Sequence, residues 1–157
     1  MIRVIGDVML DRWISGSVDR ISPEAPVPVL LEHSVESSLG GAANVAVNLS
    51  KLKQDIVLYG DIGGDDEGII VKNLLLNYDI GSMMHVGLEK TTVKTRIIDK
   101  KGKCLLRVDS ECKCKSDASS VSLLEDVNNL DIVVISDYDK GVIKDDSLEK
   151  ISNKTNF

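Results

Sequence analysis

The chain has 157 residues, of which 43% are hydrophobic and 28% charged, a composition typical of one globular domain with a buried core. Its net charge of −6 argues against a nucleic-acid partner or binding to an anionic membrane surface. No apolar run reaches membrane-spanning length and the first residues show no signal-peptide pattern, so we expect a cytoplasmic protein without a membrane partner.

The first predicted element is a buried parallel strand at residues 2–5, which is followed by Asp7. Ligands of open α/β sheets bind outside the carboxyl ends of such strands. Asp7 and a second carboxylate, Asp11, are therefore candidates to accept hydrogen bonds from sugar hydroxyls. The alternative is structural, with Asp7 capping a turn and Asp11 solvated.

The segment 13–31 differs in composition from the rest of the chain, because it contains all three prolines and the single tryptophan, Trp13. Proline is excluded from central strands but is tolerated in edge strands and extended segments. We expect an extended excursion with edge strands outside the main sheet, in which Trp13 supports a partner surface; a plain surface loop is the alternative.

Two glycines, Gly40 and Gly41, precede a run of small and apolar residues that predicts a helix over residues 42–52, packed close against a sheet. Without a Cβ atom, these glycines let a ligand approach the backbone at the positive end of the helix. Asn44 in the first turn is placed to bind the same ligand. Alternatively, this is only a junction at which Asn44 satisfies the backbone.

The remaining pattern alternates helices with parallel strands and predicts an α/β fold. Strands are expected at 55–60, 79–86 and 131–136, and helices at 69–78, 121–127 and from residue 147. The glycines after the second strand do not form a GxGxxG motif, because Ile62 occupies its second glycine position, and no GxxxxGK[ST] loop occurs.

A β-hairpin is predicted from residues 92–99 and 104–109 around a basic turn at 100–103. Lys94, Arg96 and Arg107 alternate with apolar residues, so one face of this ribbon is expected to be cationic and able to hold a phosphate. A solvated edge strand is the alternative. The nearby Cys112 and Cys114 have no second cysteine pair or nearby histidine, so we expect no metal site.

Four segments in this order resemble the kinase domain of D-glycero-β-D-manno-heptose-7-phosphate kinases, in the ribokinase (PfkB-type) family. They are residues 6–12, 20–29, 40–46 and 136–141. The resemblance covers nearly the whole chain. It implies a Rossmann-like, mostly parallel sheet with flanking helices, plus a small β-sheet lid from about residues 12–34 and 91–110. Because lids of two subunits often clasp in such kinases, it also implies a homodimer.

The resemblance also implies a set of residues that bind a sugar phosphate. They are Asp7, Asp11, Gly40, Gly41, Asn44, Arg107, Asp137 and Lys140. Within this set, Arg107 is the lid candidate for the substrate phosphate, and Asp137 corresponds to an acidic position near substrate and metal.

The chain departs from the family pattern because the catalytic Gly-Ala-Gly-Asp motif is absent from its sequence. We therefore expect residues 1–157 to be the N-terminal, acceptor-binding part of the domain, without catalytic residues and without ATP or Mg²⁺, which the complete enzyme would bind. By the resemblance, that enzyme phosphorylates heptose 7-phosphate at its anomeric hydroxyl, toward ADP-heptose for lipopolysaccharide. The alternatives are a non-catalytic truncated relative, which binds a sugar phosphate or dimerises through its lid, and a fragment of another sugar or nucleoside kinase.

Overall fold

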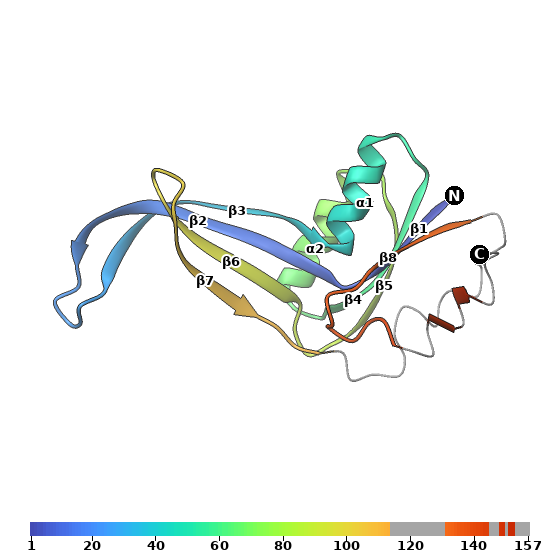
Figure 1. Ribbon diagram of the computed structural model, residues 1–157. Coiled ribbons are helices and arrows are strands. Elements are labelled where there is room, and N and C mark those ends of the chain that lie inside the picture. The colour runs from blue at the N-terminus through green and yellow to red at the C-terminus, as the bar shows by residue number, and fades with distance from the viewer. Residues whose placement is uncertain (114–130, 145–147, 150, 153–157) are drawn as a thin grey trace.

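The computed structural model describes residues 1–113, 131–144, 148–149 and 151–152. Their strands form two four-stranded sheets, a body sheet and a lid that extends from it as a long ribbon (Figure 1). The body sheet has the order β5-β4-β1-β8, with every neighbouring pair parallel. These strands are Gly81–Leu88, Ile56–Gly63, Ile2–Gly6 and Ile132–Ser136. The predicted α/β class with a mostly parallel sheet and a β lid is confirmed.

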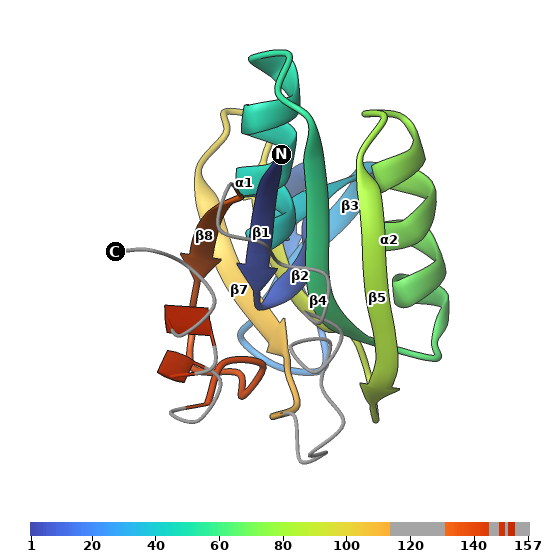
Figure 2. The ribbon, with the colours of Figure 1, turned by 90° about the vertical axis from the view of Figure 1, so that its right-hand side faces the viewer.

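The body sheet is covered on one face by helices α1 (Ala42–Lys51) and α2 (Asp66–Leu76), as Figure 2 shows. Successive residues of a strand point to opposite faces. Val4 accordingly packs in the core under the helices, whereas Ile5 packs on the other face with Val142 and Ile143. Both faces of β1 are buried, so its sequence is mostly apolar, as expected for a parallel strand. Its one charged residue, Arg3, is buried in an ion pair with Asp131 at 2.7 Å.

The lid has the order β3-β2-β6-β7, with β2 and β6 parallel and the other pairs antiparallel. Its strands are Pro28–Gly41, Val8–Ile21, Thr92–Asp99 and Cys104–Ser110. The β6–β7 hairpin matches its prediction. The β2–β3 ribbon is longer at both ends than the expected 12–34, and β2 lies inside the sheet rather than at its edge. The expected edge strand is β3, which lies at the edge of the lid sheet and begins at Pro28, a position where proline is tolerated.

Some predicted boundaries shift for local reasons. Helix α1 begins at Ala42, as predicted, with Gly41 as its N-cap residue, but Gly40 and Gly41 also form the end of strand β3. Helix α2 begins at Asp66, earlier than expected, because the side chain of Asp65 caps it by accepting a hydrogen bond from the Gly68 N–H at 3.0 Å. The helix predicted over 121–127 lies outside the described residues. Among the helices that the structure describes, none has the length and apolar character needed to cross a membrane.

Candidate functional site

Asp7 joins the lid to the body at the end of strand β1. Its N–H donates to the Ser136 carbonyl at 3.1 Å, and its own carbonyl accepts from the Ala42 N–H at 2.9 Å. Its carboxylate Oδ2 accepts from the backbone N–H groups of Tyr138 at 2.6 Å and Lys140 at 3.2 Å. One residue therefore ties together the ends of β1 and β8, the start of α1 and the loop after β8.

The Asp7 carboxylate is buried, with only 1% of the residue exposed. Burial raises its pKa above the ordinary value, and the N–H groups of Tyr138 and Lys140 oppose this rise. Its second oxygen, Oδ1, has no hydrogen-bond partner among the described residues. The structure thus shows Asp7 in the capping role that was the alternative to sugar binding, and direct contact with a substrate stays a prediction.

Asp11 and the two glycines meet where the lid leaves the body. A Cβ atom at Gly40 would lie 2.5 Å from Oδ2 of Asp11, so any other residue there would displace this carboxylate from its position. Gly41 has a φ of 56°, and a Cβ atom there would lie 2.2 Å from the Asp7 carbonyl oxygen. Asn44 is exposed in the first turn of α1, which follows directly. Four of the predicted site residues, from β2, β3 and α1, are therefore gathered at one corner.

Lys94 and Lys140 share one carboxylate at the base of the lid. Nζ of Lys140 donates to Oε2 of Glu111 at 2.6 Å, and Nζ of Lys94 lies 3.8 Å from its Oε1. Lys94 comes from β6, and Lys140 follows β8. These ion pairs therefore connect the lid to the loop after β8 on the body.

Arg107 lies further out on β7, directly opposite Arg96 of β6 in the ladder. Its side chain is 57% exposed, and its Nε donates to Oδ1 of Asp109 at 3.0 Å. Arg96 and Lys94 likewise have acidic partners. The expectation of a cationic lid face is corrected: acids on the same and neighbouring strands balance its charge, which the alternation within one strand does not reveal.

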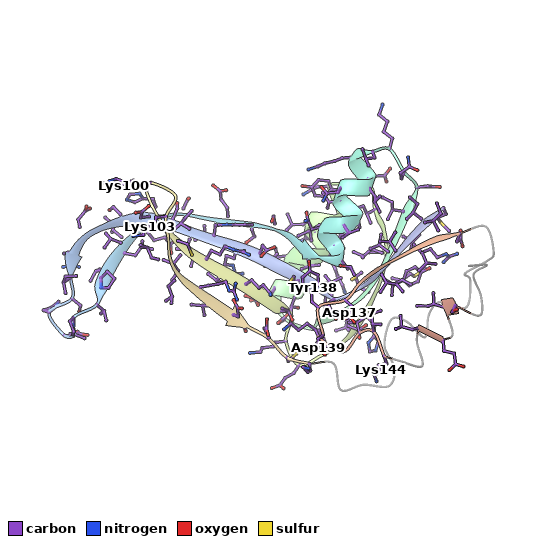
Figure 3. The ribbon with its side chains drawn as sticks, viewed as in Figure 1. Lys100, Lys103, Asp137, Tyr138, Asp139 and Lys144 are labelled. Carbon is purple, nitrogen blue, oxygen red and sulfur yellow. The ribbon has the colours of Figure 1, made fainter. Side chains whose placement is uncertain are left out.

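Asp137 lies with Tyr138 and Asp139 where the lid meets the body, far from the lid turn that carries Lys100 and Lys103 (Figure 3). Its side chain accepts from the Asp139 N–H at 2.8 Å, so it shapes the loop after β8. Asp137 is exposed. It is placed at the carboxyl end of the body sheet, as its pattern predicted.

An ion pair at this corner joins Asp11 to Arg96, a residue that the sequence pattern assigned only to the cationic face. Nη1 of Arg96 lies 2.6 Å from Oδ1 of Asp11, and its guanidinium stacks over the Trp13 ring at 5.3 Å. A cavity of about 450 Å³ extends from Trp13 along the same lid face. It is lined by Trp13, Ser15, Ser34, Glu36, Ser38 and Ile98. Because the parallel β2–β6 pairing joins segments distant in sequence, no local signal predicts this contact.

Comparisons with known proteins give concordant results. Residues 1–156 match the family described as pfkB family carbohydrate kinase. The bifunctional protein HldE of Azorhizobium caulinodans is 40% identical over 152 residues, which cover 92% of this chain and 32% of that protein. The D-beta-D-heptose 7-phosphate kinase of Bordetella bronchiseptica is 41% identical over 152 residues, covering 94% of this chain and 48% of that protein. The chain thus spans about a third to a half of the length of these relatives.

Solved structures show the same fold at lower sequence identity. A Staphylococcus aureus protein assigned as a phosphofructokinase superposes with a TM-score of 0.79 at 18% identity, over 98% of this chain and 49% of that one. A ribokinase from Thermotoga maritima gives a TM-score of 0.51 at 20% identity, over 69% of this chain and 35% of that one.

Proposed function

Because this chain belongs to the pfkB family of carbohydrate kinases, we propose that it forms the acceptor-binding part of a sugar kinase whose acceptor is a heptose 7-phosphate. The sugar kinase class rests on the family match over residues 1–156. The choice of a heptose 7-phosphate is supported by relatives at 40% and 41% identity, one of which is named for that substrate.

The observation that carries the proposal is the corner formed by Asp11, Gly40, Gly41 and Asn44. A sugar has many hydroxyls, so its site needs several hydrogen-bond acceptors and donors close together, at a place where the protein backbone lets the sugar approach. Here a carboxylate oxygen lies against Gly40, and an exposed amide follows one helical turn away. A hydroxyl donating to Asp11 is the interaction that we propose orients the acceptor.

We propose that the cations of the lid and of the loop after β8 bind the phosphate of the acceptor. Arg107 is exposed and offers a planar fork of donors, the geometry that suits a phosphate. Lys140 would exchange its contact with Glu111 for one with the substrate. Asp137 follows β8 at the carboxyl end of the body sheet, where the lid meets the body.

ATP and Mg²⁺ are the donor and metal that we expect in the complete enzyme. The described part of this chain offers no group of three or more metal-binding side chains, and the sequence has no phosphate-binding loop. We therefore propose for this chain the binding and orientation of the acceptor, and for the rest of the complete enzyme the binding of the donor and its metal.

Titration calorimetry of the purified chain tests the proposal. We expect saturable binding of D-glycero-D-manno-heptose 7-phosphate, tighter than that of the unphosphorylated heptose or of glucose 6-phosphate. Asp11→Ala and Asn44→Ala should each weaken binding by about 1–3 kcal/mol, because each removes a hydrogen-bonding partner of a buried hydroxyl. Asp19→Ala is the matched control, since this acid lies on the same strand with a side chain 71% exposed.

Two results would contradict the proposal. One is a wild-type chain that does not distinguish heptose 7-phosphate from the two comparison sugars. The other is an affinity that stays the same in both Asp11→Ala and Asn44→Ala.

A further inference from the structure

The two oxygens of the Asp11 carboxylate have different surroundings. Oδ1 is held by Arg96 at 2.6 Å, whereas Oδ2 lies in the space that the missing Cβ of Gly40 leaves open. A carboxylate on a strand otherwise rotates about its side-chain torsions. The contact with Arg96 selects one orientation and keeps Oδ2 available beside Gly40.

Arg96 is itself held in place from a second side. The β2–β6 register pairs Arg96 with Trp13, two residues along β2 from Asp11 on the same face. The guanidinium lies 5.3 Å from the centre of the Trp13 ring, within the range of a cation–π contact. Trp13, Arg96 and Asp11 therefore form a row in which each side chain fixes the next.

A neighbouring arginine shows what a purely structural ion pair looks like here. Arg12 lies on the same strand but points to the opposite lid face, where its Nη2 is 3.3 Å from Oε1 of Glu67. That pair joins the lid to helix α2 and touches none of the predicted site residues. The Arg96 pair differs because its carboxylate is the one that lies against Gly40.

We propose that Arg96, held by Trp13, is a positioning residue: it orients the Asp11 carboxylate so that Oδ2 accepts a hydroxyl of the acceptor sugar. This inference rests on the proposed function and adds to it a role that acts through Asp11 rather than by contact with the substrate. It follows that the effects of Arg96 and Asp11 on sugar binding are coupled, because removing Arg96 weakens binding only while Asp11 is present.

A double-mutant cycle on heptose 7-phosphate binding, measured by titration calorimetry on the purified chain, tests this coupling. We expect Arg96→Gln to raise the dissociation constant about tenfold, as for the loss of one charge-assisted contact. We expect Asp11→Asn to raise it at least as much. The double variant should bind no more weakly than Asp11→Asn alone, because the two residues act as one unit.

Two further variants separate positioning from folding. Arg96→Lys keeps the charge without the planar fork, and should recover part of the affinity lost in Arg96→Gln. Arg12→Gln is the matched control and should bind like the wild type. Thermal unfolding of each variant shows whether it is folded. If Arg96→Gln does not fold, Arg96→Lys and Trp13→Phe replace it in the test. We expect each of these two variants to weaken binding a few-fold.

The outcomes separate this inference from the function on which it rests. A wild-type chain that does not bind heptose 7-phosphate overturns both. A wild-type chain that binds, with Arg96→Gln equal to it, overturns only the role of Arg96. Additive losses in the double variant would likewise overturn positioning, and would show that Arg96 contacts the substrate independently of Asp11.

Discussion

The carboxylate of Asp65 connects the start of helix α2 to the residue that precedes strand β6. It accepts from the N–H of Gly68 at 3.0 Å, and from the N–H and hydroxyl of Thr91 at 2.7 and 2.5 Å. Burial acts to raise the pKa of Asp65, but these donations outweigh it and hold the pKa below the ordinary value. Asp65 thereby links the body helix to the lid.

We predict that Asp65→Ala lowers the free energy of unfolding at pH 7 by about 1–3 kcal/mol, through the lost cap and the unpaired Thr91 groups. Because the folded-state pKa is depressed, the contribution of Asp65 is present above its unfolded value of 3.8 and is lost as the pH falls through the folded value. Urea unfolding of wild type and variant at pH 7 and pH 3 measures this.

The neighbouring Asp66, which is exposed, provides the control for this prediction. Asp66→Ala should change the free energy of unfolding by no more than about 0.5 kcal/mol. A deficit in Asp65→Ala that is as large at pH 3 as at pH 7 would show that the ionised carboxylate is not responsible.

For single residues, the sequence predicted where a side chain lies in its element better than it predicted which groups that side chain binds. Asp7 was placed correctly at the end of the first strand, but the N–H groups that it binds lie more than 130 residues further along the chain. Arg96 and Asp11 are 85 residues apart. Contacts between such distant segments depend on which strands become neighbours, and residue types at local spacing carry no information about that.

An apolar row crosses the lid on the face opposite Asp11. The strand register aligns Val35, Ile14, Ile97 and Leu106 across β3, β2, β6 and β7. The outer two side chains are substantially exposed, Val35 at 49% and Leu106 at 56%. Exposed apolar rows and unpaired edge strands are features that a second copy of a chain can cover.

We predict that the chain forms a homodimer through its lid and that this row lies in the contact. The double variant Val35→Asp/Leu106→Asp should shift the chain to monomer, because it places charges in an apolar interface. Light scattering at high micromolar concentration measures the mass. Leu76→Asp is the control, since this residue at the end of α2 is 78% exposed and lies outside the lid.

A wild-type monomer at that concentration would refute lid-mediated dimerisation. A dimer that persists in the double lid variant would place the contact elsewhere on the molecule.

Elements whose hydrophobic residues repeat with a clear period were predicted well. Elements that run from the buried core into solvent were not. The β6–β7 hairpin has a basic glycine turn between two short runs, and its bounds agree closely with prediction. Strand β2 starts inside the body core at Val8 and ends exposed at Ile21, so no single alternation runs through it. Its beginning was therefore missed.

For the whole molecule, we predict that the purified chain does not transfer a phosphoryl group by itself. The reaction depends on holding donor and acceptor together and on stabilising the transferring group. The chain has a proposed acceptor site, but its sequence contains no Gly-Ala-Gly-Asp run and no phosphate-binding loop. A coupled assay of ADP release with heptose 7-phosphate and Mg-ATP measures this.

Sugar-dependent turnover at ordinary enzyme rates, roughly 1 per second or faster, would contradict this prediction. The gene sequence downstream of Phe157 gives an independent check. A reading frame that continues into a Gly-Ala-Gly-Asp segment supports the kinase proposal, whereas a stop codon supports a non-catalytic relative.

The strand order β5-β4-β1-β8 also determines when strand β1 can gain its second neighbour during synthesis. Strand β1 leaves the ribosome well before its neighbour β8, because Ile2 pairs with Ile132, about 130 residues later in the chain. At about 5–20 residues per second, translation of that interval takes on the order of ten seconds. For all that time Val4 and Ile5 lack one of the strands that will flank them, so the nascent chain carries an open, apolar sheet edge that other chains or chaperones can bind before β8 arrives.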